Sequence, residues 1–198
     1  NVAIGRASMF GVSGNSHENN TAVGYKSLEG ITTADGIVAI GSQAAKALTT
    51  GGGNTAIGFK AGFSLVDDAY NTFVGYQAGM MTEGGADAAN VYIGYLAGYQ
   101  VDDGVSNVAI GREAMESSTA GGNDASYNVA IGDRAMEAVT DSDNNIAIGY
   151  KTMLVHTGGE RNIAIGSEAM DDTDAGSDSL SSIDNIFLGY RAGSGTWQ

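Results

Sequence analysis

A single pentapeptide recurs along the whole chain. It reads NVAIG at residues 1–5, 107–111 and 128–132, and near-copies fill the intervals. The eleven copies are residues 1–5, 20–24, 37–41, 54–58, 71–75, 90–94, 107–111, 128–132, 145–149, 162–166 and 185–189. Their final glycines are most often 17 residues apart, and the longer spacings are 19, 21 and 23 residues. A period this short corresponds to one supersecondary unit that is stacked on copies of itself.

The composition of the block favours a β-strand. The second residue is always Val, Thr or Ile, and the fourth is always Ile, Val or Leu. Such stiff side chains pack well on a pleated surface. Seventeen residues are enough for two short strands and two turns, which make one coil of a parallel β-solenoid. We therefore expect an all-β, single-domain fold over residues 1–198: a β-roll of about eleven coils with a 17-residue base repeat.

The third residue of the block is Ala in eight copies and aromatic in three, so both faces of the strand are apolar. We expect the second and fourth residues to form the core and the third residue to face outward, because side chains alternate along a strand. An apolar stripe on a thin solenoid indicates self-association, and a cyclic trimer closes such a stripe. The candidates for this homotrimer interface are Ala56, Phe73, Tyr92, Ala109, Ala130, Ala147, Ala164 and Phe187.

Two block positions are nearly or fully constant within the chain. Asn opens ten of the eleven copies, and Ile37 is the exception. This Asn either bonds its own turn or forms a ladder from coil to coil, and the two are compatible. The closing Gly indicates a positive φ or a close backbone approach. The structural repeat residues are Asn54, Gly58, Asn71, Gly75, Asn107, Gly111, Asn128, Gly132, Asn145, Gly149, Asn162 and Gly166.

Bulky residues after the block alternate between two positions. An aromatic residue follows the glycine in six copies, and four of these have Gly three residues later. Four of the five copies without the aromatic residue carry Met at that later position: Met9, Met115, Met136 and Met170. We interpret this as an exchange of volume, in which either the ring or the thioether fills each coil.

The chain is strongly acidic, with a formal net charge of −14. This charge argues against nucleic-acid binding and against adsorption to anionic membranes. Acidic residues concentrate in the turns, where they keep the rim solvated, and some could bind Ca²⁺. The candidate calcium ligands, from DSDNN and DDTDAGSD, are Asp141, Asp143, Asp171, Asp172, Asp174 and Asp178. Calcium is the one cofactor that the sequence suggests.

Several other classes of site are disfavoured. The chain has no cysteine, and no apolar run approaches the ~20 residues that cross a bilayer. His17 and His156 lie eight repeats apart, so they cannot share a metal or a catalytic triad. The pair Asp102–Asp103 does not flank a cleft as glycosidase carboxylates do. We expect no catalytic residues and no enzyme, and we expect binding specificity in the insertions at 112–128 and 167–185.

The repeats N-[VTI]-A-[IV]-G, with a small residue three positions later, resemble the head repeats of YadA-type trimeric autotransporter adhesins. NTAIGFKAGF (54–63) and NTFVGYQAGM (71–80) look even more like repeats of bacteriophage tail fibres. The resemblance implies a left-handed parallel β-roll in a homotrimer. The adhesin heads use a period of about 14 residues, so the period of 17 favours the phage fibre. Residues 1–198 include neither the coiled-coil stalk nor the membrane anchor of those adhesins, so we expect a segment of a longer chain.

These observations give a set of expectations about function. We expect a segment of a longer fibre on a virion or other extracellular surface, acting as a rigid spacer and binding a host glycan or protein. One alternative is the head of a bacterial adhesin on the outer-membrane surface. A more remote alternative is a polysaccharide depolymerase. We expect no nucleic-acid partner and no membrane insertion.

Overall fold

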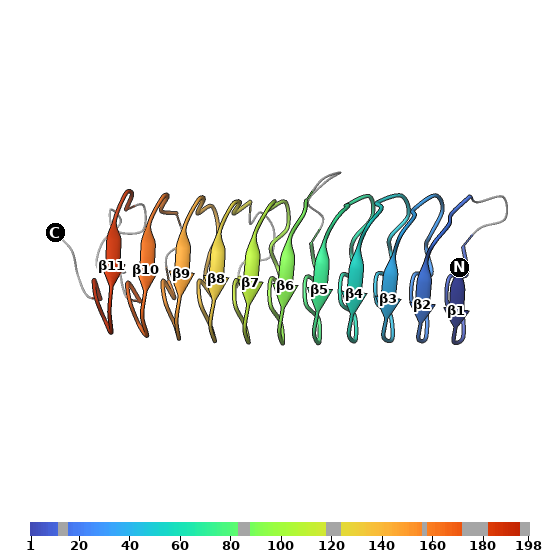
Figure 1. The fold of residues 1–198 in the computed structure, drawn as a ribbon, viewed down its shortest axis with the longest axis horizontal. Helices are drawn as coiled ribbons and strands as arrows, with labels where there is room; N and C mark the ends of the chain where they lie inside the picture. Colours follow the sequence, from blue (N-terminus) through green and yellow to red (C-terminus); the bar gives the residue numbers. More distant parts are fainter. Residues whose placement is uncertain (12–15, 83–87, 118–123, 156–157, 172–181, 195–198) are drawn as a thin grey trace.

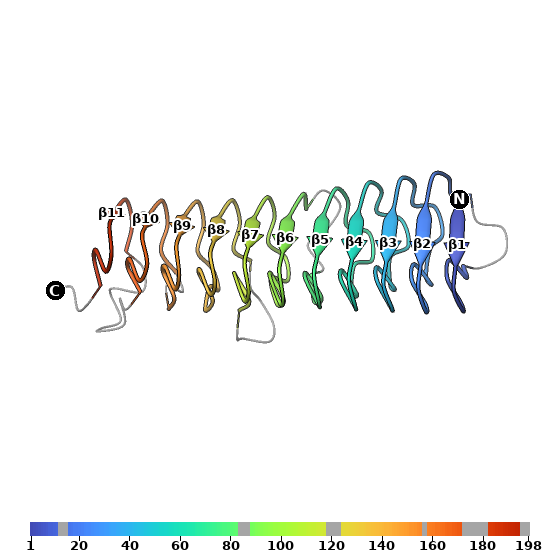
Figure 2. The ribbon, with the colours of Figure 1, turned by 60° about the horizontal axis from the view of Figure 1, so that its bottom comes forward.

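The computed structural model describes residues 1–11, 16–82, 88–117, 124–155, 158–171 and 182–194. Eleven three-residue strands form one sheet, in which each strand pairs in parallel with its neighbours in sequence. Figures 1 and 2 show the strands as successive rungs of a straight rod, with β1 and β11 at opposite ends of its long axis. The strands are β1 (Val2–Ile4), β2 (Thr21–Val23), β3 (Val38–Ile40), β4 (Thr55–Ile57), β5 (Thr72–Val74), β6 (Val91–Ile93), β7 (Val108–Ile110), β8 (Val129–Ile131), β9 (Ile146–Ile148), β10 (Ile163–Ile165) and β11 (Ile186–Leu188).

The expected parallel β-solenoid and its repeat are confirmed. Every block stacks on the next with like positions paired, as in Ala109 opposite Ala130 and Ile110 opposite Ile131. This pair of coils keeps its register although 21 residues separate the two blocks. The extra residues therefore leave the strand ladder unchanged. We refer to the coil that begins with strand βn as coil n.

The described residues contain one strand per coil, so the expectation of two strands is wrong. After the block glycine, the chain returns through a turn in which left-handed residues alternate with others. Lys60 has a φ of 54° and Met136 has a φ of 52°. A β-strand needs negative φ throughout, so this segment cannot pair as a strand. It still stacks, because Met136 N donates to Thr152 O at 2.9 Å in the next coil.

These turns hold non-glycine residues in a conformation that costs roughly 1 kcal/mol or more for each residue. The same two positions of the turn are left-handed in coil after coil. Hydrogen bonds to the coils on both sides fix them there: Lys60 N donates to Ser42 O in the coil before, and Ala45 N to Ala61 O in the coil after. The stack of coils thus imposes the backbone conformation of each turn.

The predicted asparagine ladder is confirmed at the buried start of each block. Asn128 Oδ1 accepts from the backbone N–H of Asn145 at 2.9 Å, and Asn145 Oδ1 accepts from the N–H of Asn162 at 2.9 Å. The side-chain amides also bond from coil to coil as predicted: Asn162 Nδ2 donates to Asn145 Oδ1 at 3.1 Å. Further bonds go to the backbone, such as Asn128 Nδ2 to Ser142 O at 2.7 Å. Asn54 also bonds Gly51 O in its own turn at 3.0 Å, so both interpretations of the Asn hold.

The core lies between the sheet and the returning turns. It contains the middle residues of the strands, the alanine three residues after the block glycine, and the residue that follows this alanine. Met115, Met136, Met153 and Met170 stack there beneath strands whose middle residue is Ala. In coils 5, 6 and 11 the middle residue is aromatic, and Gly occupies the methionine position.

The predicted exchange of volume is therefore real, but its partner was misassigned. An ideal Cβ on Gly79 would lie 2.6 Å from the ring of Phe73, the middle residue of β5. The ring that follows the block glycine lies outside the coil; Tyr76, for example, is 46% exposed. The inner ring of the strand, and not this outer ring, takes the volume that methionine fills elsewhere.

Candidate functional surfaces

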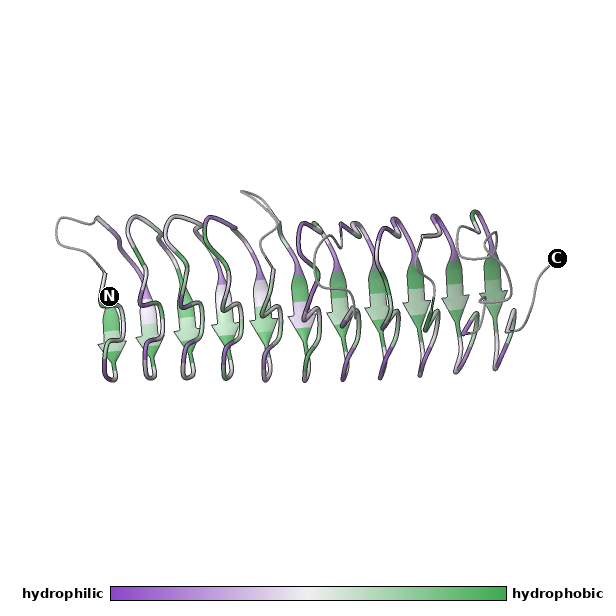
Figure 3. Cartoon of the chain, turned by 180° about the vertical axis from the view of Figure 1, so that it is seen from behind, coloured by the Kyte–Doolittle hydropathy of each residue, from purple (hydrophilic) through white to green (hydrophobic). Residues whose placement is uncertain are grey.

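The first and last residues of the strands form a continuous surface, which we call the outer face. It is apolar except for Thr21, Thr55 and Thr72 at the start of β2, β4 and β5. Each of the strands β2–β10 has a buried middle residue, and its first and last residues are partly or fully exposed. In the interior of the rod, Ile40, Ile93 and Ile165 are 38%, 37% and 40% exposed. Figure 3 shows hydrophobic strands from one end of the sheet to the other, with hydrophilic residues in the turns.

The expected orientation of the strands is wrong: the middle residue faces the core, and the first and last residues face outward. The side chains proposed for a trimer interface point into the coil, and all but one are completely buried within the single chain. Phe187, in the last strand, is partly buried and packs against the same core. A coil of 17 residues encloses little volume, so alanine faces inward and the larger β-branched residues face outward. The residues that were expected at a trimer interface, and that instead face the interior of the coil, are Ala56, Phe73, Tyr92, Ala109, Ala130, Ala147, Ala164 and Phe187.

The five residues after each block glycine, which we call the post-glycine turn, carry a second surface. Phe59, Tyr76 and Tyr95 occupy its first position in coils 4, 5 and 6 and stack along the rod. Their ring centroids are 5.3 and 5.4 Å apart, at interplanar angles of 21° and 14°. Stacking of this kind follows directly from repeating one aromatic position at the strand spacing.

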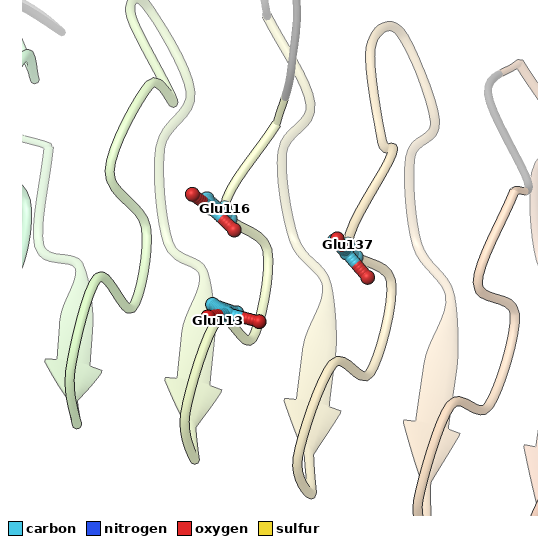
Figure 4. A group of neighbouring side chains, drawn as sticks. All are labelled: Glu113, Glu116 and Glu137. Atoms are coloured by element: carbon cyan, nitrogen blue, oxygen red, sulfur yellow. The ribbon is translucent and has the colours of Figure 1, made fainter.

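Three glutamates approach each other in the post-glycine turns of coils 7 and 8 (Figure 4). One carboxylate oxygen from each of Glu113, Glu116 and Glu137 lies within 4.8 Å of the others. Burial, together with the charges of Glu113 and Glu137, raises the pKa of Glu116. Arg134 Nη2 donates to Glu137 at 2.7 Å, and Arg112 Nη1 donates to Glu113 at 2.9 Å. The guanidinium groups therefore supply the positive charge that this group needs.

The glutamate group was not predicted from the sequence, although a signal for it is present. Glu116 and Glu137 are both the fifth residue after a block glycine, in neighbouring coils. Residues at equal positions of neighbouring coils stack in this fold. Alignment of the repeats by their turns, and not only by their strands, would have placed the two carboxylates side by side.

The aspartates predicted to bind calcium differ in their contacts and exposure. Asp143 Oδ1 accepts from the N–H of Ser126 at 2.8 Å, so this carboxylate caps the turn of the previous coil. Asp141 is exposed, and neither it nor Asp143 or Asp171 belongs to a group of three acidic side chains within the described residues. Asp172, Asp174 and Asp178 lie outside the described residues. Calcium binding there stays a prediction.

The histidines and aspartates considered for catalysis do not come together in the described part of the chain. His17 lies at the first coil, where Asn1 Nδ2 is 3.1 Å from its Nδ1, and His156 lies outside the described residues. Asp102 and Asp103 lie in a turn, one partly exposed and the other exposed. Absence of enzymatic activity stays an expectation.

Within the described ranges, the chain forms no helix with the length and apolar character of a bilayer crossing. The chain matches no protein-family model, no curated protein and no solved structure. Its function therefore has to be argued from the outer face and the post-glycine turns alone.

Proposed function

We propose that this chain is a non-enzymatic fibre segment of a bacteriophage tail, in which three parallel copies pack through their outer faces. The segment acts as a rigid spacer and carries an attachment surface for the host. The observation that carries the proposal is the outer face itself: a mostly apolar ribbon that continues along all eleven strands and is left half-exposed or exposed by the single chain.

The shape of the outer face restricts its occupant. At a strand spacing of about 4.8 Å, the ribbon is on the order of 50 Å long, but it is only two side chains wide. A globular partner would cover a few rungs, whereas a parallel copy of the same straight rod covers the ribbon from end to end. Exposed apolar surface of this extent is normally buried in an assembly. Three copies close around one axis without leaving a free ribbon.

The outer face also explains why the rod needs partners. A solenoid whose core is mostly alanine and methionine buries little apolar area for each ordered residue. Val108, Val129 and Ile146 stack in one outward row, and Ile110, Ile131 and Ile148 stack in the other. Removal of these rows from water contributes about 25 cal/mol for each Å² buried. Association thus stabilises a fold that a single chain stabilises weakly.

Sedimentation equilibrium tests this proposal. The mass of one chain is 20.1 kDa, and we expect three times this value. The variant Ile131→Lys/Ile148→Lys places two charges in one outward row and should dissociate the trimer. Thr50→Lys is the matched control, because Thr50 is exposed in a turn away from the strands and should leave the mass unchanged. A wild-type chain that sediments as a monomer at micromolar concentration contradicts the proposed assembly.

A further inference from the structure

The post-glycine turns divide the rod into two chemically different halves. In coils 1–6 these turns contain four cationic residues and one acidic residue, together with seven aromatic residues. In coils 7–11 the same turns contain four cationic and six acidic residues. An overall charge of −14 therefore conceals a basic and aromatic region at the N-terminal half of the rod.

Ring contacts and ion pairs join the cations of this region into one surface. Arg6 and Lys26 lie over the ring of Tyr25, with their charged groups 5.5 and 5.7 Å from its centroid. Lys26 Nζ is 2.9 Å from Glu29, and Lys46 Nζ is 3.9 Å from the same carboxylate. Coils 1, 2 and 3 are thereby connected.

The connection continues through coil 4. Lys46 and Lys60 both lie over the ring of Phe63, each 5.2 Å from its centroid. Lys60 is also 5.5 Å from the centroid of Phe59, which begins the stack with Tyr76 and Tyr95. We call the cationic and aromatic residues of these turns, from coil 1 to coil 6, the basic-aromatic strip.

The strip presents one cation for each coil along its first four coils, although the turn position of the cation differs from coil to coil. Coils 1–4 contribute one cation each: Arg6, Lys26, Lys46 and Lys60. The coils follow each other at about 4.8 Å, so one cation follows another along the rod at about this step. Contacts with the ring faces restrict the long side chains, which lowers the entropy lost when an anion binds. Tyr76 and Tyr95 are 46% and 48% exposed and extend the array with hydroxyl groups.

We propose that the basic-aromatic strip binds an extended carboxylated polysaccharide, with uronate carboxylates paired to successive cations. The rise of one coil is close to the length of one sugar in an extended chain, so consecutive uronates can follow consecutive coils. Tyrosine hydroxyls then bond sugar hydroxyls beyond the last cation. The inference rests on the proposed function only in that the strip faces a cell surface.

A nucleic acid is a poorer fit to this surface. Its phosphates are denser than one charge for each coil, and a long polyanion also meets the acidic turns that follow coil 6. An anionic bilayer is a poorer fit because the strip offers cations held against ring faces and no amphipathic helix in the described residues. Both are included as arms of the test.

The test compares polygalacturonate with its fully methyl-esterified form, with single-stranded poly(dT) and with vesicles of anionic phospholipid. We expect calorimetry to detect polygalacturonate binding that disappears on esterification and weakens roughly tenfold between about 50 and about 200 mM salt. The triple variant Lys26→Gln/Lys46→Gln/Lys60→Gln should lose tenfold or more in affinity. Glutamine suits the left-handed turn position of Lys26 and Lys60, because Gln43 and Gln77 occupy the same position with φ of 61° and 54°. Lys46 lies at the last turn position, which is not left-handed.

Lys151→Gln is the matched control. Lys151 lies over Tyr150 at 5.2 Å in the same turn position, but it belongs to the acidic half of the rod. Its replacement should leave the affinity unchanged. Absence of polygalacturonate binding, equal loss in the Lys151 variant, or tighter binding of poly(dT) or vesicles would each overturn the inference. Sedimentation of the same samples separates this inference from the proposed assembly. A trimer that does not bind polygalacturonate would overturn the inference about the strip and leave the assembly in place.

Discussion

Tyr92 and Gly98 compete for one space inside coil 6. An ideal Cβ on Gly98 would lie 2.3 Å from Cδ2 of Tyr92, closer than any real contact. In the next coil, Ala109 and Met115 occupy the corresponding positions, and both are buried. The strand centre and the turn therefore share a fixed volume, which one coil fills from the strand and the next fills from the turn.

This relationship predicts a rescue between two damaging substitutions. Tyr92→Ala should cost about 3–5 kcal/mol because it leaves a cavity, and Gly98→Met should be destabilising because it overlaps the ring. The double variant recreates the Ala–Met pair of coil 7. Its free energy of unfolding should be about 1–3 kcal/mol higher than the sum of the two single effects predicts. Urea denaturation of all four proteins measures the coupling. Simple additivity would show that the two side chains do not share one volume.

Substitution of a block glycine should be far more damaging inside the rod than at its last strand. A Cβ on Gly111 would lie 2.3 Å from Gly132 O, whereas a Cβ on Gly189 meets nothing within 4 Å. Both have left-handed φ, at 140° and 123°. We expect Gly111→Ala to cost more than about 4 kcal/mol and Gly189→Ala about 1–2 kcal/mol. Similar losses in thermal unfolding would mean that φ, and not the contact between coils, requires glycine.

Loss of one asparagine from the ladder should reduce stability by about 2–4 kcal/mol. Asn128→Ala removes the oxygen that accepts from the buried N–H of Asn145. Asn1→Ala is the control, because Asn1 makes the same bond to Asn20 N at 2.9 Å but is exposed at the end of the rod. Chemical denaturation should show the larger effect at Asn128, and equal effects would contradict a role for burial.

The glutamate group predicts an unusual dependence on pH. Burial and the neighbouring Glu113 and Glu137 raise the pKa of Glu116 above its ordinary value of 4.5. The folded state therefore disfavours the ionised form, and this cost is present at neutral pH and disappears as the pH falls through the raised pKa. Glu116→Gln should raise the melting temperature at pH 7, with the gain shrinking toward the ordinary pKa of glutamate.

Glu137→Gln provides the opposite case at the same turn position. It removes the carboxylate that accepts from Arg134, so it should not raise the melting temperature. Thermal unfolding of both variants across this pH range checks the assignment. A gain at Glu116 that stays constant down to acidic pH would exclude ionisation as its cause.

The sequence alone was enough to predict the stacking and its register. Identical blocks such as 107–111 and 128–132 leave only one pairing in which like residues meet, and the structure has this pairing. It was not enough to assign the inner face, because both faces of each strand are apolar and alternation alone does not say which one is buried. The pairs Phe73–Gly79 and Tyr92–Gly98 contain that information, since only residues that share a core exchange volume.

The left-handed turns could not be predicted from residue type. Lys60, Met136 and Glu168 have no intrinsic preference for positive φ, and the conformation follows from contacts with other coils. The basic-aromatic strip was missed for a related reason. Its cations come from different turn positions in coils 1–4, so the pattern emerges only after the coils are stacked.

The backbone of each turn is held by its neighbours, which has a consequence for how the molecule forms. An isolated winding would have strained dihedral angles with no bonds to compensate them, so growth requires an existing template at one edge. Folding should then spread linearly from a nucleus of several windings, and fraying should begin at the two extremities. Resistance to unfolding should accordingly increase with the number of windings, so a shortened rod would melt earlier than the full one.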